Sequence, residues 1–303
     1  MKVGVTGAAG FIGRHVLRAL AERGHDAVAL VHETPAPPTF ESRAFDVSGD
    51  LSAALEGLDA VVHGAAYVPR SYRDPAEAQR CLDVNAIGTL NVLRACAASK
   101  TKKVVVLSGN IYRLGPDPAT EEAPFDPSSS APYYLASKAC ADFYASHFDR
   151  AEQLPVAILR PSAVYGPGLA RGMIASFAAK LSTGEPVTVQ DGGRYRADLV
   201  HVEDVAIAAA ESVVRDARGP FNIGAGATVS ALDIAHTIAD LLGVSRSLVH
   251  VEPPSRAATA PVGFPPLDIT RARLELAFAP RDLPRGLSSY LEWHASHAGG
   301  GSP

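Results

Sequence analysis

The stretch KVGVTGAAGFIG, residues 2–13, decides the fold. Its first five residues, Lys2–Thr6, are a short apolar run typical of a buried strand, and the glycines that follow open a predicted helix that ends near Arg23. Gly24-His25 interrupts the pattern, and Ala27–Val31 is the next predicted strand. A glycine motif indicates a dinucleotide site when it joins a strand to a helix within a unit of about 30 residues, as it does here.

The glycines have two roles in such a unit. They permit a tight turn and a close approach of phosphate to the backbone, and the N–H groups at the helix start bind a pyrophosphate. A plain glycine turn in a parallel sheet is the alternative, but the flanking strands and helix favour nucleotide binding.

The alternation of apolar strand and amphipathic helix continues as far as Ile223. Buried strands that alternate with helices predict an α/β fold with a doubly wound parallel sheet, covered on both faces. The further predicted strands are Ala60–His63, Lys103–Leu107, Val156–Leu159 and Phe221–Ile223, and the predicted long helices are Pro75–Ser99 and Pro132–Ala151.

Proline and glycine become frequent from Gly166 to Gly193, which marks a change of organisation. We expect a smaller lobe over the carboxyl ends of the strands, where open α/β sheets bind ligands. Its pieces are a helix at Ala231–Leu242, a proline-rich stretch at Pro253–Pro266 and short helices at Thr270–Leu276 and Gly286–His297. The expected domains are a dinucleotide-binding domain at 1–167 with 198–225, a substrate lobe at 168–197 with 226–297, and a flexible tail at 298–303.

The composition narrows the functional class. Of the 303 residues, 47% are hydrophobic and 20% are charged, and the net charge of −4 argues against a nucleic-acid partner. Cys81, Cys96 and Cys140 have neither disulfide nor metal-site spacing, so we expect no metal and a reducing compartment. Met1 leads directly into a short strand, and no run of about 20 apolar residues occurs. We expect a cytoplasmic protein with no signal peptide and no membrane partner.

Tyr134 and Lys138 are the strongest catalytic candidates. Four residues apart on a predicted helix, they share one face. A phenol ionises near pH ~10, and a nearby cation lowers that pKa toward neutrality. The pair can therefore exchange a proton during hydride chemistry at a carbinol carbon, although the same spacing occurs in many helices without function.

Motifs along nearly the whole chain carry a resemblance. They are TGAAGFIG at 6–13, Asp46-Val47, VVHGAA at 61–66, VPRSYRDP at 68–75, Asn85 in NAIGTLNVL, Ser108, YLASK at 134–138, RPSAVYGPG at 160–168, LVHVEDVA at 199–206 and FNIGAG at 221–226. The chain resembles the extended short-chain dehydrogenase/reductase family, in its NAD-dependent epimerase/dehydratase branch and near the nucleotide-sugar 4-epimerases. The resemblance implies a Rossmann-type doubly wound parallel sheet with a smaller C-terminal substrate lobe.

The resemblance also implies residue roles. Tyr134 would be the acid/base, Lys138 its pKa partner and ribose ligand, and Ser108 the hydroxyl that holds the substrate oxygen. Ser108 has the alternative of capping a loop, and Asn85 the alternative of fixing a helix backbone. The implied cofactor contacts are Gly7, Gly10, Phe11, Ile12, Gly13, His32, Asp46, Val47, Ala65, Ala66, Asn85, Tyr134, Lys138 and Pro161, and the implied substrate contacts are Arg70, Ser71, Arg196 and Arg256. His63 is interpreted as a packed histidine at a strand end.

Two departures from the family bear on the cofactor and the reaction. Val31 stands where NAD-preferring relatives carry an acid for the ribose 2′-hydroxyl, followed by His32 and Glu33. Glu33 could accept from that hydroxyl and His32 could tolerate a 2′-phosphate, so the cofactor is NAD, which we favour, or NADP. Gly109-Asn110 replaces the Asp-Glu pair of the sugar dehydratases and argues against dehydration.

Two further departures bear on the substrate. Ala163 and Ala197 replace an asparagine and an arginine that help relatives to bind the diphosphate of a nucleotide sugar. Arg196 is one residue away and would point to the other side of a strand, whereas Arg256 matches another phosphate-binding arginine.

Three functional hypotheses follow. The leading one is an NAD(P)-dependent epimerase that acts on a nucleotide sugar through a transient keto intermediate. The alternative is an NADPH-dependent reductase of a keto-sugar or another small ketone, and a remote one is a non-catalytic dinucleotide sensor. By analogy with the family we expect a homodimer that pairs through the helices at 75–99 and 132–151.

Overall fold

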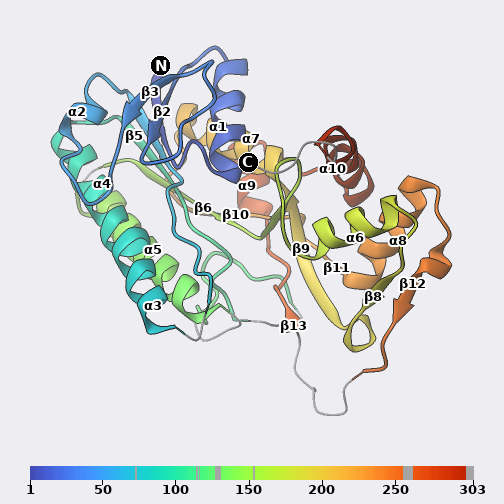
Figure 1. The fold of residues 1–303 in the computed structure, drawn as a ribbon. Helices are drawn as coiled ribbons and strands as arrows, with labels where there is room; N and C mark the ends of the chain where they lie inside the picture. The colour runs from blue at the N-terminus through green and yellow to red at the C-terminus, as the bar shows by residue number, and fades with distance from the viewer. Residues whose placement is uncertain are drawn as a thin grey trace.

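Seven parallel strands form the central sheet in the order β3-β2-β1-β4-β5-β6-β10 (Figure 1). The computed structural model describes residues 1–71, 74–113, 115, 117–126, 131–152, 154–254 and 262–297. The strand order reverses between β1 and β4, and ligands bind in the crevice at such a switch point. The strands are β1 (Lys2–Thr6), β2 (Asp26–Val31), β3 (Glu41–Ala44), β4 (Ala60–His63), β5 (Lys103–Leu107), β6 (Val156–Pro161) and β10 (Gly219–Ile223).

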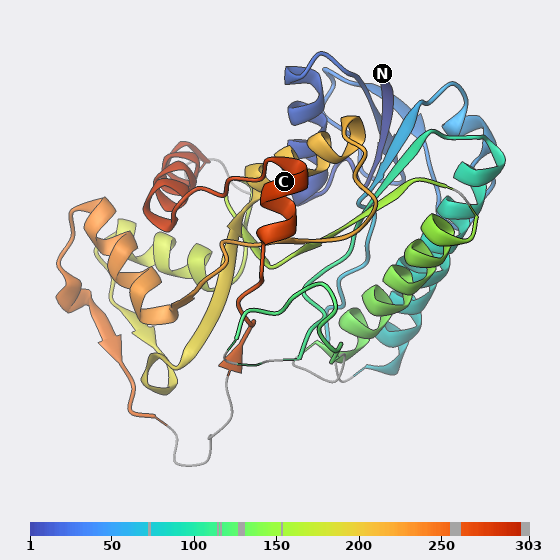
Figure 2. The ribbon, with the colours of Figure 1, turned by 180° about the vertical axis from the view of Figure 1, so that it is seen from behind.

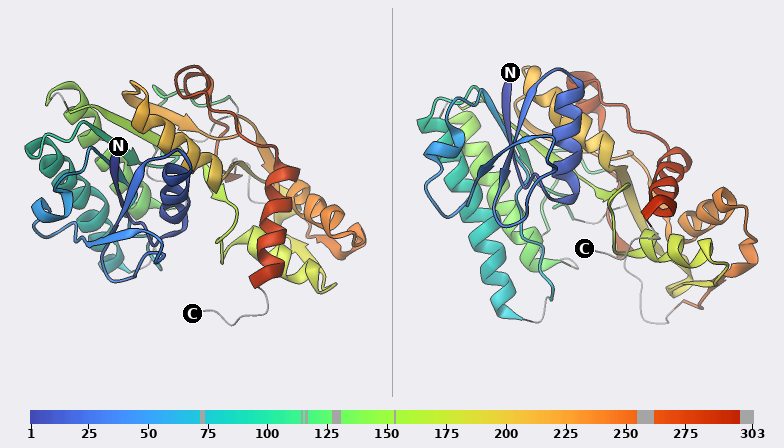
Figure 3. Two further views of the ribbon diagram at one scale, coloured as in Figure 1. Left: turned by 90° about the horizontal axis from the view of Figure 1, so that it is seen from above. Right: turned by 45° about the horizontal axis from the view of Figure 1, so that its top comes forward.

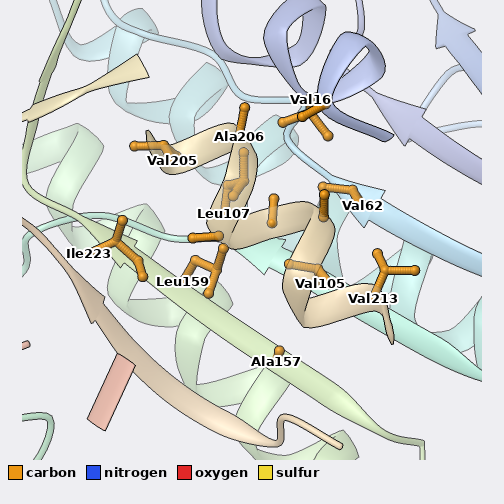
Figure 4. Close-up of a cluster of buried hydrophobic side chains, with 14 of the residues drawn as sticks. Val16, Val62, Val105, Leu107, Ala157, Leu159, Val205, Ala206, Val213 and Ile223 are labelled. Atoms are coloured by element: carbon orange, nitrogen blue, oxygen red, sulfur yellow. The ribbon is translucent and has the colours of Figure 1, made fainter. Parts of the chain in front are cut away.

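Helices cover both faces of this sheet because successive strand residues point to opposite sides. Val62 and Leu107 pack toward one helical layer, whereas Val61 and Val106 pack toward the other. Figure 4 shows the first of these cores, where Val16 and Val213 meet the strand side chains. The first layer is α1 (Phe11–Glu22), α7 (Val202–Val214) and α9 (Thr270–Leu276), and the second is α2 (Ser52–Leu55), α4 (Gly88–Ala98) and α5 (Pro132–Arg150).

The doubly wound parallel sheet predicted from the sequence is confirmed. The helix predicted at 75–99 is instead three pieces: α3 (Pro75–Cys81), a π-helical segment (Leu82–Ile87) and α4. Strand β3 escaped prediction because its side chains are largely exposed at the sheet edge and none is a large apolar group. Helix α10 (Leu283–His297) begins three residues before the predicted start.

A smaller lobe lies beside the sheet and has its own core (Figures 1 and 2). Its helices α6 and α8 lie together with α10, as the view from above shows (Figure 3). No helix among the residues that the structure describes has both the length and the apolar character needed to cross a bilayer. The further elements are β7 (Ala163–Tyr165), α6 (Met173–Ser182), β8 (Val187–Val189), β9 (Tyr195–His201), β11 (Thr228–Ser230), α8 (Ala231–Leu242), β12 (Val249–Val251) and β13 (Val262–Gly263).

Strand β9 connects the lobe to the loops above the sheet. It pairs with β7, β11 and β13. Because β9 spans Tyr195–His201, the predicted domain boundary at 197/198 falls inside this strand. The buried Asp198 carboxylate accepts hydrogen bonds from the N–H groups of Ala225, Gly226 and Leu267 at 2.6, 3.1 and 3.0 Å. These bonds hold three chain segments at one point, and the division into two domains stays a prediction.

His201 ends β9 and caps helix α7. Its Nδ1 accepts from the Glu203 N–H at 3.3 Å, and only 1% of the residue is exposed. Burial, reinforced by the nearby Arg281 guanidinium, lowers the pKa of His201 from 6.5 to about 4. The folded protein therefore holds a neutral imidazole over a range in which the unfolded chain takes up a proton.

We expect the free energy of unfolding to fall as the pH drops from about 6.5 to about 4, by on the order of 3 kcal/mol for His201 alone. The variant His201→Asn retains a cap acceptor but cannot titrate, so this part of the pH dependence should disappear. Urea unfolding of both proteins at pH 7.5, 5.5 and 4 measures it. An identical pH dependence in the two proteins would show that His201 is not held neutral.

Candidate active site

The glycine turn between β1 and α1 forms a cradle that side chains would fill. Gly7 has φ +65°, and a Cβ there would lie 2.7 Å from the Gly64 carbonyl oxygen. A Cβ on Gly13 would collide with the Gly7 carbonyl oxygen. No side chain caps α1 at Gly10, so the N–H groups of its first turn face outward for a ligand. This arrangement suits a pyrophosphate.

A cavity of about 390 Å³ lies beside this turn. Seven of the predicted cofactor contacts line it, namely Gly7, Gly10, His32, Asp46, Val47, Ala65 and Ala66. The predicted contacts Phe11 and Ile12 begin α1, where Phe11 lies edge-on to His15 and Ile12 packs on the core, and Pro161 ends β6.

The far end of the cavity carries acidic groups. Asp46 Oδ1 accepts from the N–H and the hydroxyl of Ser48 at 2.9 and 2.7 Å, and these bonds hold the pKa of the Asp46 carboxyl below its usual value. His32 Nε2 lies 3.7 Å from Asp46 Oδ2, and Glu33 also lines the cavity. The described residues that line this cavity include no arginine or lysine, so the side chains beside a 2′-phosphate there would be those of His32, Glu33 and Asp46.

Two of the three predicted catalytic residues, Tyr134 and Lys138, lie close together near the carboxyl end of β5, which Ser108 follows directly. Lys138 donates from Nζ to the Leu107 carbonyl at 2.8 Å, and Leu107 directly precedes Ser108. The same Nζ lies 5.8 Å from the centroid of the Tyr134 ring. The Ser108 hydroxyl is buried without a hydrogen-bond partner among the described residues, which is costly unless a ligand supplies one.

Lys138 lies in a dry environment. It is 5% exposed, and burial lowers the pKa of its ammonium from 10.5 to about 8. Most of the lysine is still protonated at neutral pH, so a positive charge persists beside the Tyr134 phenol. An unsolvated cation at this distance favours the phenolate and can lower the free energy of proton transfer.

Asn85 lies in the π-helical segment, beneath the loop that follows β4. Its amide group exchanges two hydrogen bonds with the backbone of Tyr67, at 2.7 and 2.9 Å, and donates to Ser137 Oγ at 2.9 Å. Ser137 in turn donates to the Tyr134 carbonyl at 2.8 Å. These contacts fix the loop backbone at Tyr67 rather than a helix backbone, and the role of Asn85 toward the cofactor stays a prediction.

Three of the four predicted substrate contacts lie in the part of the chain that the structure describes. Arg70 is exposed, and its N–H donates to Glu77 Oε2 at 2.7 Å, next to Ser71. Arg196 projects from β9 on the side opposite the buried Ala197, and its guanidinium donates to Thr228. Arg256 lies outside the described residues. Substrate binding by these four residues stays a prediction.

Asn110 was given no binding role from the sequence, yet it adds a polar group near Ser108. Its Nδ2 lies 3.3 Å from Ser162 Oγ and 3.4 Å from the Pro265 carbonyl oxygen, which leaves Oδ1 buried without a partner among the described residues. The available sequence signal was its position two residues after Ser108.

Comparisons with known proteins show which family the chain matches. Residues 3–224 match the model described as the NAD dependent epimerase/dehydratase family. The chain is 28% identical to dTDP-4-dehydro-6-deoxy-D-allose reductase of Streptomyces sp, over 97% of this chain and 96% of that protein. It is 30% identical to UDP-glucose 4-epimerase of Mycolicibacterium smegmatis, over 97% and 98%.

Solved structures show the same likeness. MoeE5 in complex with UDP-glucose and NAD superposes with a TM-score of 0.82 at 30% identity, over 98% of this chain and 100% of that one. UDP-glucose 4-epimerase of Thermotoga maritima with UDP-glucose gives a TM-score of 0.84 at 25% identity, again over 98% and 100%.

Proposed function

This chain belongs to the NAD-dependent epimerase/dehydratase family, an enzyme of the extended short-chain dehydrogenase/reductase type, and we propose that it epimerises a nucleotide sugar through a transient keto intermediate. The observation that carries the proposal is the contact of Lys138 with the end of β5. Its ammonium donates to the Leu107 carbonyl, directly before Ser108, and lies beside the Tyr134 ring, and the Ser108 hydroxyl has no hydrogen-bond partner among the described residues. A phenol, a neighbouring cation and a hydroxyl donor can together support proton transfer beside a hydride site.

The residues fit NAD as the cofactor. The open amides after Gly7 and Gly10 would hold the pyrophosphate, Asp46 and Val47 would meet the adenine, and Lys138 would reach the nicotinamide ribose. When bound, the nicotinamide supplies a hydride acceptor. The acidic cavity end favours NAD over NADP, since Glu33 and Asp46 would repel a 2′-phosphate.

The protein groups then divide the proton chemistry. Tyr134, as phenolate, takes the proton of the substrate hydroxyl while the carbon loses hydride, and Ser108 donates a hydrogen bond to the same oxygen. Lys138 stabilises the phenolate through its charge. Epimerisation would require the ketone to be reduced again from its opposite face, and Tyr134 would then return the proton to the same oxygen. Gly109 and Asn110 offer no acid or base for loss of water, so dehydration is not supported.

A reductase is the second candidate. Val31 favours it, although Glu33 and Asp46 at the same end of the cavity disfavour the 2′-phosphate of NADPH. Val31 cannot hold a ribose 2′-hydroxyl, so the cofactor would be retained less firmly than a recycled one needs to be. A reductase must release its cofactor in every turnover. The similarity to the Streptomyces reductase supports this alternative as well.

The amount of nicotinamide cofactor consumed per sugar converted distinguishes the two reactions. We expect wild-type protein with catalytic NAD to interconvert at least one UDP- or dTDP-hexose with its 4-epimer, without net change in nicotinamide absorbance. Oxidation of NADPH in amounts equal to an added 4-keto-hexose nucleotide, with no epimer formed, would make the protein a reductase instead. NAD binding without either reaction would support the remaining hypothesis, a non-catalytic dinucleotide sensor.

We also propose a homodimer that pairs through the α3–α5 layer. Leu82, Ile87 and Tyr144 remain partly exposed there, and a groove lies between α4, α5 and residues 48–52. Two such faces together could bury the apolar side chains in a four-helix arrangement. Sedimentation equilibrium tests this proposal, and a monomer at micromolar concentration would contradict it.

A further inference from the structure

A buried chain of hydrogen bonds links the end of β1 to the start of α4 through His63. Thr6 Oγ1 lies 2.8 Å from His63 Nδ1, and His63 Nε2 lies 3.0 Å from Thr89 Oγ1. Thr89 Oγ1 donates to the Asn85 carbonyl at 2.6 Å. All four residues are at most 3% exposed, so water does not substitute for any of these contacts. We call Thr6, His63, Thr89 and Asn85 the relay.

The direction of each bond in the relay is fixed. Thr6 Oγ1 already accepts from the N–H groups of Gly64 and Ala65, at 3.1 and 3.0 Å, so its own proton goes to His63 Nδ1. His63 therefore carries its proton on Nε2 and donates to Thr89. Burial lowers the pKa of His63 to about 3, which keeps the imidazole neutral in this tautomer. Thr89 then donates its single hydroxyl proton to the Asn85 carbonyl.

The relay holds residues 64–67, the part of the loop that lines the cofactor cavity, at both ends. Thr6 binds Gly64 and Ala65 at its start, and Asn85 binds the backbone of Tyr67 at its end. Gly64, Ala65 and Tyr67 all line the cavity.

The relay also reaches the helix that carries the catalytic pair. Asn85 donates to Ser137 Oγ, and Ser137 donates to the Tyr134 carbonyl, at 2.9 and 2.8 Å. Asn85 can face both the loop and α5 because it lies in the π-helical segment, a local geometry found frequently at functional sites.

We propose that the relay is a positioning device that sets the distance between the cavity wall at 64–67 and the Tyr134 phenol. The hydrogen bonds of the relay go to the loop and to α5, so its effect passes through these two segments. The proposal rests on the proposed function, because a fixed distance between hydride acceptor and acid/base matters only if both act on one substrate carbon.

The test replaces Thr89, in the middle of the relay, and leaves Thr6 and Asn85 unchanged. Thr89→Val preserves the shape of the side chain, removes both hydrogen bonds of its hydroxyl and leaves His63 Nε2 without an acceptor. Thr89→Ser is the matched control, because it retains the hydroxyl. We expect Thr89→Val to lower kcat by about 10- to 100-fold with less than about threefold change in KM for the sugar and Kd for NAD, and Thr89→Ser to stay near wild type.

Amide hydrogen exchange supplies a second measurement that needs no substrate. In Thr89→Val we expect faster exchange both in residues 64–71 and in the first two turns of α5, and wild-type rates in Thr89→Ser. Faster exchange confined to residues 85–93 would overturn the proposal, because the lost bonds would then matter only locally.

The kinetic outcome is independent of that result. A coupled change in exchange with an unchanged kcat would equally overturn a positioning role. If wild-type protein turns over no nucleotide sugar, the proposed function fails, and the exchange pattern alone then decides whether the relay couples loop and helix.

Discussion

Replacing Tyr134 with phenylalanine is expected to lower kcat by about 10²- to 10⁴-fold, the range that a positioned acid/base contributes. The substitution removes one oxygen and leaves the ring that lies 5.8 Å from the Lys138 ammonium. Affinity for NAD and for the sugar should change little, because the phenol hydroxyl acts during proton transfer rather than in binding. Steady-state kinetics and equilibrium binding on the same samples separate the two effects.

The neighbouring Tyr133 provides the control. It lies on the same helix but lines an outer apolar groove with Ala78 and Cys140. Tyr133→Phe should therefore retain the kcat of the wild type. If Tyr134→Phe also retained it, the proton would be moved by another group, and the proposed mechanism would be lost in either its epimerase or its reductase form.

Replacing Lys138 with methionine is expected to lower kcat by at least about 100-fold and to make the folded protein more stable at pH 7. The folded-state pKa of about 8 lies below the ordinary 10.5, so burial of this ammonium costs on the order of 3 kcal/mol below pH 8. Loss of the bond to the Leu107 carbonyl offsets roughly 1–2 kcal/mol of the gain. The fold thus retains the charge that the proposed catalysis needs, and this charge lowers the free energy of unfolding.

The pH dependence distinguishes this explanation from a general packing effect. Between pH 8 and 10.5 the unfolded chain holds a proton that the folded Lys138 releases, so the stability of the wild type should rise toward that of Lys138→Met. Urea unfolding at pH 7 and pH 9.5 measures the gap. Lys102→Met, at an exposed lysine paired with Asp59, should show no such change. A variant less stable than the wild type at pH 7 would contradict the burial cost.

Much of the fold followed from the sequence because apolar runs and glycine turns act locally. The run at Lys2–Thr6 is the observed strand β1, and the predicted helix at Ala231–Leu242 has its observed bounds. The π-helical segment at Leu82–Ile87 was missed, since the amphipathic pattern passes through it without a break. The short strands of the small lobe were also missed, because a run of about three residues carries too little periodicity.

The proximity of Tyr134 and Lys138 was accessible to prediction because helical spacing alone puts residues four apart on one face. The contact between Lys138 and the Leu107 carbonyl was not, because it joins residues 31 apart in the sequence. The same holds for the relay, whose bond from Thr6 to His63 spans 57 residues. A histidine at a strand end has no sequence signal for its tautomer, which depends on tertiary neighbours.

The central claim is that a nucleotide sugar loses hydride in this cleft while Tyr134 takes the proton. Its most direct test is the absorbance of reduced nicotinamide in a single turnover, after NAD-loaded protein is mixed with UDP- and dTDP-hexoses. The account predicts a transient rise with at least one sugar in the wild type and none in Tyr134→Phe. Absence of reduced nicotinamide with every sugar, together with no oxidation of NADH or NADPH by the matching keto-sugars, would contradict it.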